Sequence, residues 1–306
     1  MKTKVSIITI NYNALEDTIS FLASIKASSY CSNLELEVVV VDNASEVSPQ
    51  QAISEYPWVK LVQSKHNLGF AGGNNLGALD SSGDYLFFVN NDTELDLSQL
   101  EELIDQYQAH PEFGLLTPVI LNEDTSIQYA GYTELNTLTG RNKLIDTVDS
   151  GMGIKETSYP HGAAMLISKE NLDKVGLMSE NYFLYYEELD WGTRIRRAGL
   201  KIGVCLSSRI THKESVTVGR ISECKLYFMT RNRILYVRKH FTKAQRFVFS
   251  MFFFLVSTPK SLLTFAVRRD FASVKTFLAA ISWHFSNDVS SSRLGYKFDG
   301  LLKRVR

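Results

Sequence analysis

Acidic, amide and imidazole side chains that could do chemistry gather at three places in this sequence. Carboxylates and imidazoles can hold a divalent cation or accept a proton. The same groups also occur without such a role, because carboxylates favour helix starts and a single histidine often only packs. The residues concerned are Asn90, Asn91 and Asp92, then Glu187, Glu188 and Asp190, and finally His212.

The first group follows an apolar run at residues 85–89, which has the composition of a fully buried strand. Two earlier apolar, β-branched runs end in the same way, on Asn11 and on Asp42. In parallel α/β sheets, ligand-binding groups lie at the carboxyl ends of the strands. We therefore expect these polar groups to converge on one crevice, together with a glycine-rich loop at residues 65–77.

Strands alternate with helices along the chain, which predicts an α/β fold with a mostly parallel central sheet flanked by helices. The helical spacing of apolar residues predicts helices at 15–25 and 94–109. Residues 121–158 are polar and weakly patterned, so loops or short strands are expected there. The other expected elements are strands at 58–63, 161–168 and 201–206, and helices at 169–175 and from Glu187 onward.

A dinucleotide-binding enzyme is the main competitor on this type of sheet. It requires a Gly-x-Gly-x-x-Gly turn directly after the first strand, where the backbone approaches a pyrophosphate. Here that turn is Asn11-Tyr12-Asn13-Ala14, which contains no glycine. The glycines at 69, 72, 73 and 77 follow a later strand, so we set this alternative aside.

The formal net charge of the 306 residues is zero, but the charges are unevenly divided. Residues 1–224 carry 17 Lys and Arg against 30 Asp and Glu, a net charge of −13. Residues 225–306 carry 16 against 3, a net charge of +13. We therefore predict a main domain at 1–224 and a basic helical appendage at 225–306 that meets an anionic surface.

The appendage is aromatic-rich as well as basic, which favours a phospholipid surface over nucleic acid. Its most apolar stretch, residues 247–256, is shorter than the roughly twenty residues that span a bilayer, and Pro259 interrupts it. We therefore expect an interfacial position on an anionic membrane. Helices that pack on the main domain or on a partner subunit are the alternative. The three cysteines and the N-terminus give no sign of a secreted protein.

With these elements in place, the sequence resembles the family 2 glycosyltransferases of the GT-A fold, and within them the bacterial rhamnosyltransferase-like group. The resemblance covers residues 1 to about 240, and its motifs occur in the family's order. The motifs are Val5–Asn13, Val39–Ser45, Asn67–Asn75, Asn90–Asp92, Tyr185–Asp190, His212 and Arg231-Asn232.

The resemblance implies a Mg²⁺ or Mn²⁺ ion that bridges the phosphates of a nucleotide-sugar donor. Asp92 matches the family's metal-binding aspartate, and His212 matches its metal-binding histidine. Asn90 stands where many relatives have a further aspartate, so one carboxylate is left for the ion. Magnesium commonly uses few protein ligands and keeps several waters, so one carboxylate is compatible with a metal site.

The resemblance also implies a general base, because the acceptor hydroxyl must lose a proton as it attacks the sugar. Glu188 matches the position of that base, although the family usually has an aspartate there. Glu187 and Asp190 match acceptor-binding or orienting groups. One base without a covalent intermediate implies inversion at the anomeric carbon.

For the donor, the resemblance points to a UDP- or dTDP-sugar. Asp42 matches a carboxylate that accepts the imide N–H of uracil or thymine, which cytosine lacks. The other positions that match nucleotide-sugar-binding residues are Asn11, Tyr12, Asn67, Gly69, Gly73, Asn74 and Asn91.

These matches together imply an inverting, metal-dependent glycosyltransferase of cell-surface glycan biosynthesis, with rhamnose as the best guess for the sugar. The implied acceptor is a lipid-linked glycan or a polysaccharide. The implied location is cytoplasmic, at the inner face of a bacterial plasma membrane. No nucleic-acid partner is expected, and the oligomeric state is left open. The departures at Asn90 and Glu188 keep an alternative, a noncatalytic sugar-nucleotide-binding or scaffold protein on the same fold.

Overall fold

The computed structural model of the protein describes residues 2–28, 33–148, 153–213 and 223–299. Within these ranges ten strands form one sheet in the order β3-β2-β1-β4-β9-β6-β10-β5, with β7 paired to β6 and β8 to β10. The strands are β1 Thr3–Asn11, β2 Leu34–Asp42, β3 Val59–Gln63, β4 Tyr85–Val89, β5 Thr93–Glu94, β6 Phe113–Leu121, β7 Ile127–Tyr129, β8 Ile154–Glu156, β9 Ala164–Ser168 and β10 Lys201–His212.

The strands that carry the polar clusters run in one direction. β1 is parallel to β2 and β4, and β2 is parallel to β3. β9 is antiparallel to β4 and β6, whereas β6 and β10 are parallel. In the β1–β2 register Asn11 lies beside Asp42, so the polar groups after these two strands reach the same edge. The prediction of a mostly parallel sheet is confirmed.

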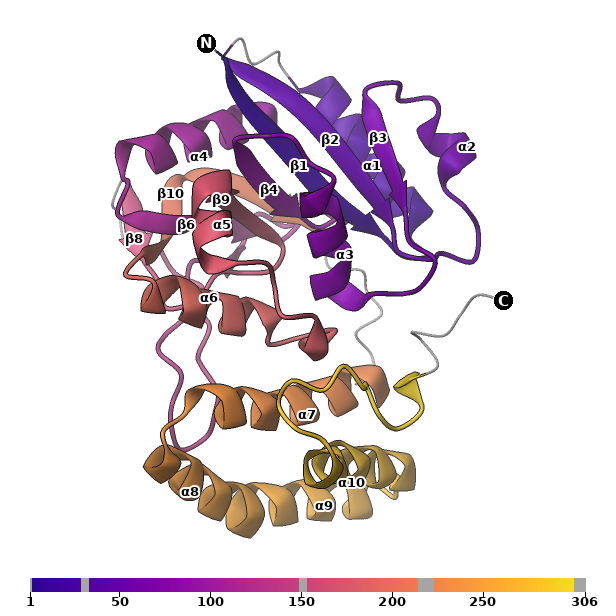
Figure 1. Ribbon diagram of the computed structural model, residues 1–306, viewed down its shortest axis with the longest axis vertical. Coiled ribbons are helices and arrows are strands. Elements are labelled where there is room, and N and C mark those ends of the chain that lie inside the picture. Colours follow the sequence, from indigo (N-terminus) through magenta and orange to yellow (C-terminus); the bar gives the residue numbers. More distant parts are fainter. Residues whose placement is uncertain (1, 29–32, 149–152, 214–222, 300–306) are drawn as a thin grey trace.

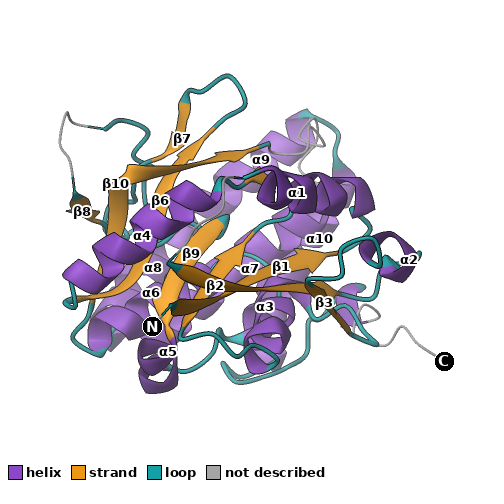
Figure 2. Ribbon diagram, turned by 90° about the horizontal axis from the view of Figure 1, so that it is seen from above, coloured by secondary structure: helices purple, strands orange, loops and turns teal. Residues whose placement is uncertain are grey.

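Helices cover both faces of this sheet (Figures 1 and 2). α1 and α4 pack on one face, while α3, α5 and α6 pack on the other. Adjacent residues of β1 point to opposite faces, so Ile7 contributes to the first core and Ile8 to the second. These helices are α1 Leu15–Ala27, α2 Gln50–Ile53, α3 Gly69–Leu79, α4 Leu97–Ala109, α5 Lys169–Val175, the 3₁₀ turn η1 Glu180–Tyr182, and α6 Glu187–Arg197.

The glycine-rich segment differs from our expectation, because it forms helix α3 and not a loop. Its glycines let the helix lie directly on the sheet. A Cβ atom at Gly73 would lie 2.8 Å from Ile10, and one at Gly77 would lie 2.4 Å from Ile8. Close packing outweighs the low helix propensity of glycine here.

The C-terminal helices form a separate layer below the sheet in Figure 1. α7 is largely buried, with Tyr227, Phe228 and Asn232 each at 0% exposure. This helix therefore packs within the protein, which is the alternative to a position on a membrane surface. α10 packs against α7. The layer consists of α7 Glu223–His240, α8 Lys243–Phe252, the π-helical segment η2 Phe253–Ser257, α9 Thr258–Val267 and α10 Phe271–Ser286.

Pro259 does not interrupt the apolar stretch, and this expectation is wrong. The segment η2 precedes α9, and Pro259 lies in the first turn of α9, where a missing N–H is tolerated. Lys243–Val267 is therefore a helix of 25 residues, which is long and apolar enough to cross a membrane by length and composition. One side of it is covered, because Phe249 and Phe253 pack into the core of the C-terminal helices.

Candidate active site

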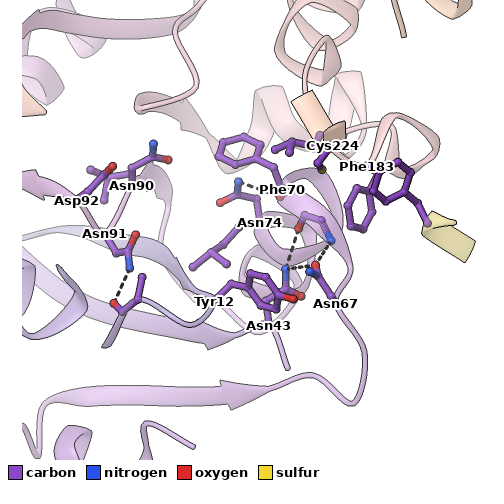
Figure 3. A pocket seen from close by; sticks show the side chains of 16 residues that line it. Tyr12, Asn43, Asn67, Phe70, Asn74, Asn90, Asn91, Asp92, Phe183 and Cys224 are labelled. Carbon is purple, nitrogen blue, oxygen red and sulfur yellow. Dashed lines mark hydrogen bonds between the residues drawn. The ribbon is translucent and has the colours of Figure 1, made fainter. Parts of the chain in front are cut away.

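A cavity of about 470 Å³ lies at the carboxyl ends of β1, β2 and β4, beside α3 (Figure 3). Figure 3 shows Asn90 and Asp92 at one end of the lining and Asn67 and Phe183 at the other. The ends of these strands therefore border one crevice, as expected. Of the predicted binding residues, the cavity is lined by Tyr12, Asn67, Gly69, Asn74, Asn91 and Asp92.

Three of the predicted donor-binding residues lie behind the cavity wall. Asn11 and Asp42 are buried at 1% and 4% exposure, and Asn11 Nδ2 donates a hydrogen bond to Asp42 Oδ1 at 3.2 Å. Asp42 Oδ1 also accepts from the backbone N–H of Ser45 at 3.3 Å. Gly73 packs on Ile10, as described above. None of the three is in the lining of this cavity, and all three hold the turns and the helix that carry the lining. Their role in binding the nucleotide-sugar stays a prediction.

Asp92 and His212 come together at one end of the cavity. Asp92 Oδ1 lies 3.1 Å from His212 Nε2, yet this buried oxygen has no hydrogen-bond partner among the described residues. Two ligands at right angles, each about 2.1 Å from a magnesium ion, would lie about 3.0 Å apart. The pair therefore has the spacing of two neighbouring metal ligands. Burial raises the pKa of Asp92, but the contact with His212 lowers it more, so this carboxyl is ionised at neutral pH.

Gln128 orients the imidazole of His212. Its Oε1 atom lies 2.7 Å from His212 Nδ1 and can only accept, so Nδ1 carries the proton. Nε2 is then the ring nitrogen that would bind a metal ion. Asn90 Nδ2 lies 3.4 Å from the same nitrogen. Among the described residues, no group of three His, Cys, Asp or Glu side chains could hold a metal, so further ligands would come from substrate and water.

A second cavity, of about 650 Å³, contains Glu187 and Glu188 in its lining. It shares Phe70, Asn90 and Leu184 with the first cavity, so the two are neighbours. Burial raises the pKa of Glu188 to about 7, although backbone hydrogen bonds act in the opposite direction. Burial, followed by the charge of Glu188, raises the pKa of Glu187 well above its usual value. At neutral pH, Glu188 is therefore the carboxyl that can give up and regain a proton.

Asp190 does not line this second cavity, which corrects our expectation that it orients the acceptor. It lies two residues beyond Glu188, about 200° further around the helix, so it faces the other way. The carboxylate is fully buried and contacts Arg194 Nε at 2.9 Å, Lys239 Nζ at 2.9 Å and His240 Nε2 at 2.7 Å. Burial raises its pKa, but His240 and Lys239 lower it much more. Asp190 therefore links α6 to the end of α7.

The family to which this chain belongs follows from a match to a protein-family model. The family model for Glycosyl transferase family 2 matches residues 6–176, which is more than half of the chain. The chain belongs to glycosyl transferase family 2. The matched residues include the first cavity's polar lining from β1, β2, α3 and β4. The prediction of a family 2 glycosyltransferase is therefore confirmed.

The similar proteins agree with this assignment. A low-salt glycan biosynthesis hexosyltransferase of Haloferax volcanii is 29% identical over 250 residues, covering 80% of this chain and 78% of the relative. An N-acetylglucosaminyl-diphospho-decaprenol L-rhamnosyltransferase of Mycobacterium tuberculosis is 23% identical over 245 residues, covering 70% and 77%. The mannosyltransferase PcManGT of Pyrobaculum calidifontis, solved with GDP-Man and Mn²⁺, superposes with a TM-score of 0.57 at 15% identity, covering 94% and 76%. The last likeness confirms the GT-A fold.

The loop that delivers Glu187 and Glu188 to the glycosyltransferase site has a strained backbone. Phe183, Tyr185 and Tyr186 have φ values of 67°, 68° and 76°, a backbone conformation that residues other than glycine rarely adopt. Asn232 on α7 holds this loop. Its buried Nδ2 group lies 2.8 Å from each of the carbonyl oxygens of Tyr182, Leu184 and Tyr185, so its two N–H bonds are shared among three acceptors. The C-terminal helices therefore fix the start of α6.

Replacing Asn232 with alanine should damage catalysis more than donor binding. Three carbonyl groups lose an amide donor, so we expect the free energy of unfolding to fall by about 2 kcal/mol. We also expect kcat to fall by roughly 10²-fold, because a displaced loop misplaces Glu188. Asn287→Ala is a matched control, since Asn287 Nδ2 donates to Trp283 O and Ser286 Oγ, away from the site. Steady-state kinetics and urea denaturation test this; a stable, fully active Asn232 variant would contradict it.

Several residues that line the first cavity were not predicted from the sequence. Asn43 directly follows Asp42, and its Nδ2 atom donates to Gly69 O at 3.0 Å while its Oδ1 atom accepts from Leu68 N–H at 2.9 Å. Its position at a strand end was a usable signal. Cys224 and Phe298 also line the cavity, and they come from the C-terminal part of the chain. No local pattern marked them, because only the tertiary fold brings the end of the chain back to the strand edge.

Proposed function

We propose that this glycosyltransferase is an inverting, divalent-metal-dependent enzyme of cell-surface glycan synthesis. It moves a sugar, with rhamnose as the leading candidate, from a dTDP- or UDP-sugar to a hydroxyl of a lipid-linked glycan or polysaccharide. The observation that carries the proposal is the meeting of two cavities, one ending at Asp92 and His212 and the other containing Glu188. The similarity to a named rhamnosyltransferase supports the choice of sugar.

Glu188 acts as the general base in this proposal. The acceptor sugar occupies the second cavity, where the Glu188 carboxylate takes the proton from its hydroxyl as the oxygen attacks the anomeric carbon. A pKa near 7 suits a base that must be ionised before the attack and basic during it. Glu187 stays protonated at neutral pH and can donate a hydrogen bond to the acceptor. The attack is direct, so the anomeric configuration inverts.

Asp92 and His212 would hold the divalent ion against the donor diphosphate. When bound, the ion would neutralise the negative charge that builds up on the leaving group. Gln128 keeps His212 in the tautomer that presents Nε2, and Asn90 contacts the same nitrogen. PcManGT has the same fold and was solved in complex with GDP-Man and Mn²⁺, which supports a divalent ion here. Tyr12, Asn67, Asn74 and the other lining residues bind the nucleotide-sugar.

A donor screen tests the proposal as a whole. The full-length protein would be incubated with dTDP-rhamnose and a panel of UDP- and dTDP-sugars, with Mn²⁺ or with EDTA, and nucleotide release would be measured. We expect release from one or a few of these donors and loss of release in EDTA. Release from none of these donors, or release that EDTA leaves unchanged, would refute the donor or the metal part of the proposal.

We further propose that the enzyme works at the inner face of a bacterial plasma membrane, bound through the exposed side of α8, α9 and α10. This side carries large apolar residues between exposed cations, as expected of a surface that enters an anionic interface. The exposed apolar residues are Phe247, Val248, Met251, Phe254, Leu255, Val256, Leu263, Val267, Phe271, Leu278 and Phe285. The exposed cations on these helices and the turn between α9 and α10 are Lys243, Arg246, Lys260, Arg268, Arg269 and Lys275.

Membrane binding should depend on this apolar side and not on exposed apolar residues in general. Phe247, Leu255 and Phe271 are 67%, 65% and 72% exposed. Each can contribute about 1.5–3 kcal/mol when buried, so we expect the triple serine variant to lose at least tenfold in vesicle binding. A double serine variant of Val47 and Leu79, which are 74% and 71% exposed on the main domain, is the control. Flotation with phosphatidylcholine vesicles, with and without phosphatidylglycerol, measures this; equal binding by all three proteins would contradict it.

A further inference from the structure

The imidazole of His161 presents an unused N–H group at the second cavity. His161 precedes β9 and lines this cavity together with Glu188. Its Nδ1 atom accepts the backbone N–H of Ala163 at 3.1 Å. A ring nitrogen that accepts a hydrogen bond carries no proton, so the proton of this neutral imidazole is on Nε2. Among the described residues, His161 Nε2 has no hydrogen-bond partner, and its N–H is left for a ligand.

Two tyrosines hold the His161 ring in place. Tyr132 lies nearly parallel to it, with 14° between the ring planes and 6.1 Å between the centroids. Tyr129, which is fully buried, lies with its centroid 4.9 Å away. Phenylalanine would fill the same space between these rings, so packing does not use the N–H group. An N–H without a partner costs free energy in a partly enclosed cavity, and a bound hydrogen-bond acceptor removes that cost.

The residues next to His161 lie where the two cavities meet. The backbone N–H of Asn90 donates to Ala163 O at 3.0 Å. A Cβ atom at Gly162 would lie 3.4 Å from the ring of Phe70. Asn90 and Phe70 line both cavities. His161 is therefore tied to the boundary between the first cavity and the second.

The transferred sugar has to lie at the same boundary. Its anomeric carbon is bonded to the diphosphate, whose proposed place is at Asp92 and His212, and it is attacked by the hydroxyl that Glu188 deprotonates. The rings of His161 and His212 meet edge to face with their centroids 6.2 Å apart. A sugar that extends from the diphosphate toward Glu188 therefore passes the N–H group of His161.

We propose that the Nε2–H group of His161 donates a hydrogen bond to a ring hydroxyl of the transferred sugar, which makes His161 a residue that selects and orients this sugar. This inference rests on the proposed function, because it concerns the donor of the same reaction. A neutral N–H group suits a hydroxyl, which carries no charge. His161 does not line the first cavity, where the nucleotide is placed. It therefore acts on the sugar and not on the nucleotide.

The binding test compares ligands with and without the sugar on the full-length protein. The donor that the screen selects, with dTDP-rhamnose as the first choice, and its free nucleoside diphosphate would be titrated calorimetrically with Mn²⁺ present. His161→Phe keeps a ring between the tyrosines and removes the N–H group. His161→Gln supplies an N–H group near the position of Nε2. His110→Phe is the control, because the His110 side chain is 43% exposed and lines neither cavity.

We expect His161→Phe to bind the sugar nucleotide about tenfold more weakly than wild type, which is the loss of one hydrogen bond. Binding of the free nucleoside diphosphate should stay unchanged. His161→Gln should recover most of the loss, and His110→Phe should bind both ligands like wild type. Unchanged binding of the sugar nucleotide by His161→Phe, or an equal loss for both ligands, would overturn this inference alone. Failure of every donor in the screen would refute the proposed function and this inference with it.

Donor analogues that each lack one ring hydroxyl separate a hydrogen bond from a packing role. Removing the hydroxyl that His161 contacts should weaken binding to wild type about tenfold. The same analogue should bind to His161→Phe about as well as the complete donor does, because both changes remove the same hydrogen bond. If the two losses added up for every analogue, His161 would act through packing alone, and the proposed contact would be wrong.

Discussion

Replacing Glu188 with glutamine is expected to reduce sugar transfer by about 10³-fold, because a positioned general base typically contributes between 10² and 10⁴ in rate. Glutamine keeps the size of the side chain and its hydrogen-bonding capacity but cannot take the proton from the acceptor hydroxyl. The side chain lines the second cavity, where we place the acceptor, and does not line the first. The KM for the donor should therefore stay close to that of the wild type, and the loss should fall on kcat.

Glu187→Gln is the matched control for this variant. Glu187 is the neighbouring carboxyl in the same cavity, and its strongly raised pKa keeps it protonated at neutral pH. Glutamine resembles a protonated carboxyl, so we expect a loss of less than tenfold. Single-turnover transfer from the donor identified in the screen would measure both variants. A Glu188→Gln variant with more than a tenth of wild-type kcat would exclude Glu188 as the base.

The pH dependence gives an independent check on the same residue. A base with a pKa of about 7 is protonated, and inactive, below that pH. We therefore expect kcat of the wild type to fall about tenfold for each pH unit below 7 and to level off above it. The residual activity of Glu188→Gln should not show this decrease below pH 7. A wild-type profile that is flat between pH 5 and 7 would show that the titrating base is another group.

Much of the donor side could be predicted from the sequence because it depends on local rules. Apolar runs that end on Asn11, Asp42 and Asp92 mark parallel strands, and the ends of such strands meet at one edge. The sequence could not show which of these side chains face the cavity. Asn11 and Asp42 turned out to bond to each other, and a bond of that kind depends on the strand register.

The acceptor side was less predictable, because it depends on contacts between distant segments. The three acids Glu187, Glu188 and Asp190 looked alike in the sequence, since all three lie in the first turn of a helix. Their roles diverge only when α7 packs beside α6 and brings Lys239 and His240 to Asp190. The appendage boundary at residue 224 likewise follows composition, whereas the fold uses α7 and Phe298 to complete the site.

Replacing Asp92 with asparagine is expected to remove most metal binding and to reduce transfer by roughly 10²-fold or more, because a divalent ion supplies several kcal/mol of charge stabilisation on the leaving group. Among the described residues, Asp92 offers the only carboxylate in contact with His212, and asparagine would remove its negative charge. Glu94→Gln is the control, since Glu94 is an exposed carboxylate on β5 that pairs with Lys213 at 2.7 Å. We expect this control to retain wild-type activity.

Binding of Mn²⁺, measured by electron paramagnetic resonance in the presence of the donor nucleotide, separates metal binding from turnover. Asp92→Asn should weaken this binding by at least 10²-fold. Gln128→Ala should weaken it by roughly 10–100-fold, because a ligand histidine that loses its outer hydrogen-bond partner binds metal less well. Gln128 contacts His212 Nδ1 and does not line the first cavity, so it can affect the ion only through the imidazole. If Asp92→Asn bound Mn²⁺ like the wild type, the ion would have to be held elsewhere, and the contact between Asp92 and His212 would be structural alone.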